Sequence, residues 1–283
     1  MSDAIQIIDV SARDGLQNEK AAIHLSATDK AHYIGLLAQS GLKRIEAGSF
    51  VHPKAVPAMA NSAEVAEALK PVAAQHPDII FSYLVPNLKG LERAAAIGAG
   101  EVAIFLALSE QFSKANINQT VEQSFRDIAP VVAAVREKNM RVRGYLSNVF
   151  GYSDTPFTPR DVATRSAQLL NMGCFEVSLG DTTGIGTPEM TSQLVDALVV
   201  ASAEPGGTVL TSDCPVGVSR KRRRKIAAAA LGAASRHPVV RGQGDRARRL
   251  RRLFQGSRRH CPGIFRQALD RRPGPGRHAS HRK

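Results

Sequence analysis

Charged residues come directly after the first apolar run of the sequence, in the segment SARDGLQNE. Arg13 and Asp14 follow the run 5–10, so they would lie at the end of a strand if that run forms one. A guanidinium that is always charged can stabilise an oxyanion, and a neighbouring carboxylate can bind a hard metal ion. Glu46 lies within the next apolar run and adds a second carboxylate. These residue types indicate a site for a metal ion and a developing negative charge.

Two later apolar runs also end in polar side chains. Tyr145 and Asn148 lie toward the end of one run, and Asp181 and Thr182 end another. In a parallel barrel the catalytic groups lie at the carboxyl ends of the strands. We therefore expect these side chains to gather at one end of a barrel, together with the residues that follow the first strand.

Each candidate also has a purely structural interpretation. An Arg-Asp-Gly segment is commonly a solvated turn, and Glu46 could be an interior salt-bridge partner for Arg13. Asp181 could cap the loop that follows it, and Cys174 is expected to be a small buried apolar side chain rather than a nucleophile. The histidines of the first 200 residues have no second histidine two or four positions away, so none makes a metal site by itself.

The elements that must position these residues follow a regular alternation. Short apolar runs alternate with amphipathic stretches, which is typical of parallel strands connected by helices. The runs predicted as strands are 5–10, 44–50, 79–85, 101–108, 141–149 and 175–181. Helices are expected from about residue 26, over 61–75, after 86–87, over about 120–139, and from the Thr-Pro pairs at 158–159 and 187–188. The prediction is an α/β fold of the TIM (βα)8-barrel type with its last two units doubtful or missing, although a doubly wound sheet would show a similar rhythm.

The charge of the chain is concentrated in its last part. The 283 residues carry a net charge of +13, but residues 1–200 hold 17 Lys and Arg against 21 Asp and Glu, whereas residues 201–283 hold 21 against 4. We therefore expect two parts, an incomplete barrel domain at 1–203 and an Arg-rich basic tail at 204–283 that is non-native or disordered.

Cysteine usage and the N-terminus bear on the compartment. Cys174, Cys214 and Cys261 are widely spaced and give no disulfide framework, which fits a reducing compartment. The acidic start MSDAIQIIDV has neither a signal-peptide nor a transit-peptide pattern, and no run approaches the roughly 18 apolar residues of a membrane span. We expect a cytoplasmic protein with no membrane partner.

The segment DVSARDGLQNEK, residues 9–20, closely resembles the signature of the 3-hydroxy-3-methylglutaryl-CoA lyases, members of the DRE-TIM metallolyase family. A lone Arg-Asp-Gly would also fit isopropylmalate and citramalate synthases or the transferase domain of pyruvate carboxylase. Further blocks resemble the corresponding family segments in the same order, at 45–59, 85–99, 110–118, 141–151 and 171–190. Six collinear blocks make the resemblance specific over about residues 5–203.

The resemblance implies roles for individual residues. Asp14 would be a metal ligand, Arg13 would stabilise the developing enolate, and Glu46 would be the third member of the Asp-Arg-Glu set. The implied substrate-binding residues are Arg13, Gln17, Tyr145, Asp181 and Thr182. The implied cofactor is Mg²⁺ or Mn²⁺, and the implied partner is an acyl-CoA substrate.

The activity implied is the cleavage of 3-hydroxy-3-methylglutaryl-CoA into acetyl-CoA and acetoacetate, a step of leucine degradation and ketone-body metabolism. A related 3-hydroxyacyl-CoA lyase, or a Claisen-type synthase of the same family, is the alternative. The sequence does not separate them, because the loops of strands 7 and 8 have no counterpart in it.

The resemblance ends where the composition changes. The family supplies two further metal ligands as a His-x-His pair, expected near residues 210–212, where this chain has Leu210, Thr211 and Ser212. No His-x-His pair occurs anywhere in the sequence, and its two Cys-Pro dipeptides lack the flanking glycines of the family's catalytic loop. We therefore expect poor metal binding and little or no lyase activity from the chain as it stands.

Two explanations account for the basic tail. A functional extension would bind nucleic acid or another polyanion through clusters such as 220–225 and 246–252, RKRRRK and RARRLRR. Alternatively, the reading frame of a GC-rich gene is lost near residues 203–210, so that out-of-frame codons supply Arg, Ala, Gly and Pro. We favour the second explanation, because the tail replaces elements that close a barrel instead of following a completed domain. Nucleic acid is therefore not an expected partner.

Overall fold

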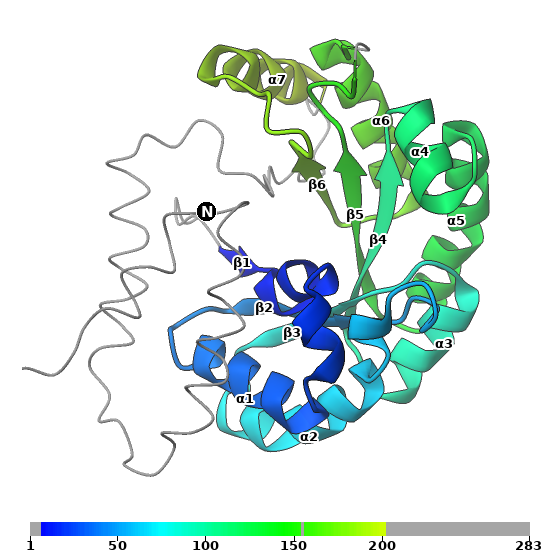
Figure 1. The fold of residues 1–283 in the computed structure, drawn as a ribbon. Coiled ribbons are helices and arrows are strands. Elements are labelled where there is room, and N and C mark those ends of the chain that lie inside the picture. The colour runs from blue at the N-terminus through cyan, green and yellow to red at the C-terminus, as the bar shows by residue number, and fades with distance from the viewer. Residues whose placement is uncertain (1–6, 154–155, 202–283) are drawn as a thin grey trace, which may run out of the picture.

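A computed structural model describes residues 7–153 and 156–201 of the chain. Within these ranges six parallel strands form one sheet, and they are hydrogen bonded in strict chain order. A doubly wound sheet would reverse its strand order at a switch point, so the consecutive order excludes that alternative. The strands curl into a half-barrel with helices around it, which confirms the barrel-type prediction (Figure 1). They are β1 (Ile8–Asp9), β2 (Arg44–Ser49), β3 (Ile80–Leu84), β4 (Glu101–Ala107), β5 (Arg141–Ser147) and β6 (Glu176–Gly180).

Most of the helices begin where the side chain of a cap residue accepts a hydrogen bond from a backbone amide of the first turn. Ser26 and Thr158 each form a capping box with the carboxylate three residues later, and Pro159 occupies the first turn, as the sequence predicted. The helices are α1 (Ala27–Ala38), α2 (Ser62–Gln75), α3 (Leu88–Ala96), α4 (Glu110–Ile117), α5 (Val121–Glu137), α6 (Pro159–Met172) and α7 (Pro188–Ala201). Three short helical turns are η1 (Ser11–Gly15), η2 (Lys20–His24) and η3 (Pro57–Met59).

Two elements differ from their predictions. The single helix expected over about 120–139 is preceded by α4, which begins at the cap residue Ser109 and ends where Asn118 adopts a left-handed φ of 54°. The strand predicted over 5–10 is described only from residue 7 and ends at Asp9. It ends there because the chain turns into η1, whose amides bond back to the carbonyl of Val10.

The outer face of the sheet packs against the helices as the main hydrophobic core. Strand residues alternate between the two faces of a sheet, and most of the outward ones are apolar. Full burial of each such side chain contributes about 1.5–3 kcal/mol relative to exposure. Fully buried members of this core include Ile34, Ile45, Leu91, Ile104, Leu106, Leu146 and Leu169.

The inward face carries charges at the N-terminal ends of the strands. Arg44 contacts Glu101 and Glu176, each at 2.7 Å. Arg143 contacts the same two carboxylates at 3.4 and 3.5 Å. All four side chains are at most 3% exposed. We call Arg44, Glu101, Arg143 and Glu176 the basal ion layer; it balances two positive and two negative charges, and the sequence did not predict it.

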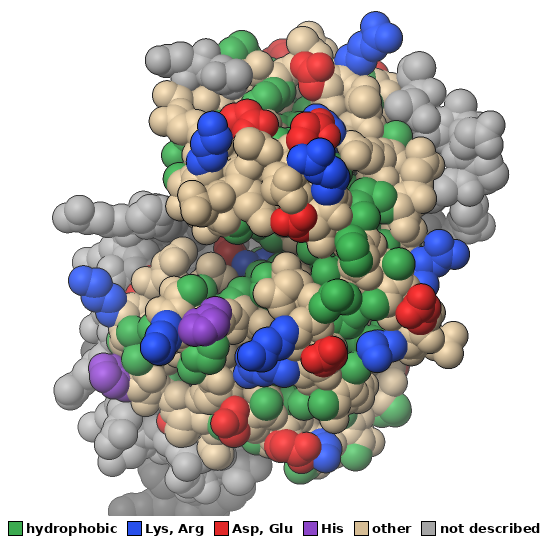
Figure 2. Space-filling view, turned by 90° about the vertical axis from the view of Figure 1, so that its right-hand side faces the viewer, with side chains coloured by type: hydrophobic (Ala, Val, Ile, Leu, Met, Phe, Trp, Pro, Cys, Tyr) green, Lys and Arg blue, Asp and Glu red, His purple; other side chains and the backbone are tan. Residues whose placement is uncertain are grey.

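The surface of the described part is not strongly basic. Lys and Arg side chains are interspersed with Asp and Glu across the face shown in Figure 2. Within the described ranges, none of the helices combines the length and the apolar character needed to cross a membrane. The predicted basic tail at 204–283 and the expected position of the histidine pair at 210–212 lie outside the described residues.

Candidate active site

The turn η1 carries Arg13 into the interior of the half-barrel. It starts from a small cluster in which the Ser11 hydroxyl lies 2.5 Å from a carboxylate oxygen of Asp9 and 2.7 Å from the Tyr33 hydroxyl. Burial raises the pKa of Asp9, and it raises the pKa of Tyr33 to about 12. The Arg13 side chain that follows is only 9% exposed, so it does not belong to a solvated turn.

Arg13 is held by carboxylates on two sides. Its Nε donates to Oε1 of Glu46, and its Nη1 donates to Oδ1 of Asp14 at 2.7 Å. Burial acts to lower the pKa of Arg13, but the charge of Glu46, assisted by Tyr145 and Asp14, raises it above the ordinary value. Arg13 is therefore a fixed positive charge in a nearly dry environment, and Glu46 is the interior salt-bridge partner that the sequence left open.

Tyr145 completes this group from β5. Its hydroxyl donates to Oε2 of Glu46 at 3.0 Å, and the guanidinium carbon of Arg13 lies 5.4 Å from its ring centroid. Both oxygens of the fully buried Glu46 therefore accept a hydrogen bond. Of the predicted site residues, the structure brings together Arg13, Asp14, Glu46 and Tyr145.

Asp14 is the most accessible member of this group, with a side chain that is 53% exposed. A Mg²⁺ or Mn²⁺ ion needs several oxygen or nitrogen ligands, of which one carboxylate supplies at most two. Among the described residues no three His, Cys, Asp or Glu side chains are placed to share a metal ion, and the sequence contains no His-x-His pair. The donors of the described part therefore do not fit a complete divalent-metal site.

Asp181 organises the loop after β6. One oxygen of its buried carboxylate accepts from the amides of Gly184 and Ile185 at 3.0 and 3.2 Å, and the other accepts from Gly186 at 3.0 Å. A Cβ at Gly186 would lie 2.5 Å from the ring of Phe150, so this close approach requires glycine. These contacts match the loop-capping alternative for Asp181.

Asn148 and Thr182 form a second, separate pair at the ends of β5 and β6. The backbone amide of Asn148 donates to the Thr182 hydroxyl oxygen at 3.1 Å, and Asn148 adopts a left-handed φ of 64°. Asn148 is fully buried, yet within the described part of the chain neither of its side-chain amide atoms has a hydrogen-bond partner. The side-chain oxygen Oε1 of Gln17 is also buried, and it too has no hydrogen-bond partner among the described residues.

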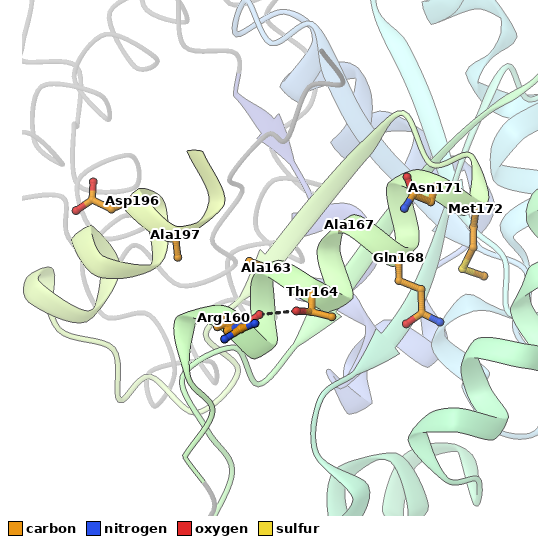
Figure 3. A pocket seen from close by; sticks show the side chains of 9 residues that line it. All are labelled: Arg160, Ala163, Thr164, Ala167, Gln168, Asn171, Met172, Asp196 and Ala197. Atoms are coloured by element: carbon orange, nitrogen blue, oxygen red, sulfur yellow. Dashed lines mark hydrogen bonds between the residues drawn. The ribbon is translucent and has the colours of Figure 1, made fainter. Parts of the chain in front are cut away.

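Two further features, Cys174 and a cavity, are separate from the Arg13 group. Cys174 is 5% exposed and its pKa is raised to about 12 by burial, as expected for a packing residue. A cavity of about 1070 Å³ lies between α6 and α7 on the helical layer, and none of the predicted site residues lines it (Figure 3). Its lining is Arg160, Ala163, Thr164, Ala167, Gln168, Asn171, Met172, Asp196 and Ala197.

Known proteins resemble this chain in both sequence and structure. A Pseudomonas aeruginosa protein named 3-hydroxy-3-isohexenylglutaryl-CoA/hydroxy-methylglutaryl-CoA lyase is 46% identical over 202 residues, which cover 71% of this chain and 65% of that protein. The crystal structure of hydroxymethylglutaryl-CoA lyase from Pseudomonas aeruginosa matches with a TM-score of 0.67 at 42% identity, covering 74% of this chain and 67% of that chain. A structure of an HMG-CoA lyase from Acinetobacter baumannii, in complex with coenzyme A and 3-methylmalate, matches with a TM-score of 0.67 at 30% identity, covering 82% and 72%.

The match has a clear limit. The aligned part of this chain spans 58% to 65% of the length of the curated relatives, so it corresponds to only part of those proteins. The family model described as HMGL-like matches residues 4–205, the same part of the chain that carries the half-barrel and the Arg13 group. This chain belongs to the HMGL-like family.

Proposed function

We propose that the carboxyl end of the half-barrel is part of the active site of a carbon–carbon lyase, a site suited to the cleavage of 3-hydroxy-3-methylglutaryl-CoA into acetyl-CoA and acetoacetate. The observation that carries this proposal is the buried guanidinium of Arg13, held by Glu46 and Asp14 at the end of β1. A fixed cation in a water-poor site stabilises an oxyanion more effectively than one that must reorganise from solvent.

The cleavage chemistry explains why such a cation is needed. Removal of the proton from the hydroxyl on C3 allows the bond between C2 and C3 to break. C3 becomes the ketone of acetoacetate, and the electron pair remains on C2 as the enolate of the thioester, which a proton at C2 converts to acetyl-CoA. Arg13 would face the negative charge that develops on the thioester oxygen. Glu46 and Tyr145 would keep its guanidinium oriented.

The substrate class rests on the relatives. The Pseudomonas aeruginosa relative is named for two 3-hydroxyglutaryl-CoA substrates that differ in the group on C3, and the Acinetobacter baumannii structure holds coenzyme A with a branched hydroxy acid. We infer that this chain recognises the same class, an acyl-CoA with a hydroxyl on C3, through Arg13, Gln17, Tyr145 and Thr182. Asp181 would act there by shaping the loop. A related 3-hydroxyacyl-CoA lyase or a Claisen-type synthase is the alternative.

The family resemblance also implies a divalent ion, which when bound would polarise the substrate oxygens. Asp14 alone does not make a site for it, so we propose that this chain binds Mg²⁺ or Mn²⁺ poorly and has little lyase activity. We further propose that the lyase domain is 1–203 and that 204–283 is not part of it. Reading the gene across codons 195–215 tests this division. A shifted frame that encodes His-x-His would support it, and an uninterrupted frame without such a pair would contradict it.

Ligand binding tests the proposed site without requiring turnover. Calorimetric titration of the full chain with 3-hydroxy-3-methylglutaryl-CoA should give measurable binding that Arg13→Met weakens by about tenfold or more, the size expected for losing a charge-assisted hydrogen bond. Arg126→Met is the matched control, because Arg126 lies exposed on α5 and contacts Gln123 on the same helix. Equal affinity of the Arg13 variant and the control would contradict the proposal.

A parallel assay tests the expected low activity. The purified chain is incubated with the same acyl-CoA and either Mg²⁺ or Mn²⁺, and acetoacetate is measured. We expect little or no release. Rapid metal-dependent release would show that the chain is an active lyase and that the metal prediction is wrong.

A further inference from the structure

Arg143 connects the basal ion layer to the candidate active site. Its side chain is 1% exposed and lies between Glu101 and Glu176 at the base of the half-barrel. Its Nη1 also lies 3.4 Å from the hydroxyl oxygen of Tyr145, and its guanidinium carbon lies 5.4 Å from the centroid of that ring. Arg143 was not among the residues that the sequence predicted for the site.

The contact with Arg143 determines which way the Tyr145 hydroxyl points. An arginine side chain can only donate hydrogen bonds, so the tyrosine oxygen must accept from Arg143. The single hydroxyl proton is then directed to Oε2 of Glu46, 3.0 Å away. The ring of Tyr145 also has the guanidinium carbon of Arg13 at 5.4 Å, the same distance as that of Arg143.

Glu46 passes this constraint on to Arg13. Because Oε2 of Glu46 is held by Tyr145, the carboxylate presents Oε1 to the Nε of Arg13. Glu46 is fully buried, so water cannot replace either partner without opening the barrel interior. The chain of contacts therefore runs from the base of the half-barrel to its carboxyl end without leaving the buried interior.

We propose that Arg143 is a positioning residue that fixes the guanidinium of Arg13 through Tyr145 and Glu46. The consequence for acyl-CoA cleavage rests on the proposed function, but the positioning itself does not. Without Arg143 the Tyr145 hydroxyl loses the donor that orients it, its hydrogen bond to Glu46 weakens, and Arg13 samples more orientations. Arg143 thus acts on the site from the opposite end of the barrel, where it touches no substrate.

Arg44 offers a matched comparison within the basal ion layer. It has the same charge and similar burial as Arg143, and it contacts the same two carboxylates. Its guanidinium carbon lies 5.4 Å from the ring of Phe175, whereas that of Arg143 lies over Tyr145. Substituting either arginine removes one cation from the layer, but only the loss of Arg143 should disturb Arg13.

The experiment measures the reactivity of Arg13 directly. The full chain and its variants are treated with phenylglyoxal, and mass spectrometry gives the labelling rate at Arg13. Arg143→Met and Tyr145→Phe should each raise that rate by about fivefold, the ratio that losing one buried hydrogen bond would produce. The labelling rate at Arg13 in the double variant should be close to that in either single variant, because both changes interrupt the same chain of contacts. Arg44→Met should leave the Arg13 rate within about twofold of the wild-type chain.

Three results would overturn the proposal: an unchanged rate in Arg143→Met, an equal rise in Arg44→Met, or fully additive rises in the double variant. Circular dichroism checks that each variant is folded. If Arg143→Met does not fold, Arg143→Lys and Arg44→Lys make the same comparison with the charge retained. A rise in Arg13 labelling in a chain that fails to bind the acyl-CoA would support the positioning role while contradicting the proposed function.

Discussion

The two ends of the half-barrel use the same residue types for different purposes. In the basal ion layer each carboxylate contacts both Arg44 and Arg143, Glu101 also contacts Arg141, and all four side chains of the layer are almost fully buried. At the carboxyl end Arg13 and Glu46 are also buried, but Asp14 keeps a side chain that is 53% exposed. The base is closed to solvent and ligand, whereas the carboxyl end leaves one carboxylate accessible. This difference matches the general division of barrels into a stabilising N-terminal end and a catalytic C-terminal end.

The largest effect on stability should come from breaking the base. Glu101→Gln removes the negative charge that Arg44 and Arg143 share, and it leaves buried positive charge uncompensated. We expect the free energy of unfolding to fall by about 3–5 kcal/mol, measured by urea denaturation. Asp78→Asn is the control, because its partner is the exposed Lys43 at the surface, and it should cause no measurable loss. Equal stability of the two variants would mean that the base does not stabilise the fold.

Acid should weaken the same layer without a mutation, but by less at any pH above the folded-state pKa of Glu101, where this carboxyl is only partly protonated. Burial acts to raise the pKa of Glu101, but its hydrogen bonds to Arg44 and Arg141 lower it below the ordinary value of 4.5. A carboxylate with a lowered pKa in the folded state stabilises fully above the unfolded value. That contribution is lost as the pH falls from 4.5 through the folded-state pKa. Urea midpoints of the wild-type chain and Glu101→Gln should therefore converge on acidification, and a constant difference would contradict this assignment.

The comparison also shows which features a sequence can reveal. The six strands and the position of Arg13 after the first of them were predictable, because apolar runs are local and Arg13 closely follows one of them. The contact between Arg13 and Glu46 could be anticipated because consecutive strands of a barrel are neighbours.

The basal ion layer could not be anticipated in the same way. Arg44 and Glu176 are 132 residues apart, and their contact depends on how the barrel curves. Arg143 contacts Glu176 because the two residues are register partners on β5 and β6, and register is not readable from one strand. The available signal was that a charged residue begins four of the apolar strands, at Arg44, Glu101, Arg141 and Glu176.

A smaller effect is expected from the loop that follows β6. Asp181→Ala leaves three backbone amides, at Gly184, Ile185 and Gly186, without their acceptor. We expect their hydrogen exchange to accelerate by about tenfold, with a loss of about 1–2 kcal/mol in the free energy of unfolding. Exchange in β5 should not change and serves as the internal control. Unchanged exchange in the loop would mean that Asp181 is available for a ligand instead of shaping the backbone.

The smallest effect on stability should come from Asp14. Asp14→Asn removes one negative charge beside Arg13, but the side-chain amide oxygen at this position can still accept from Nη1. Glu46 still compensates the buried charge of Arg13. Since the side chain is half exposed, we expect a change of less than about 1 kcal/mol. Glu46→Gln is the informative partner variant, because it changes a fully buried carboxylate that contacts the same arginine. A clearly larger loss of unfolding free energy for Glu46→Gln than for Asp14→Asn would show that Glu46 is a structural carboxylate and Asp14 an accessible one. Equal losses would contradict this distinction between the two carboxylates.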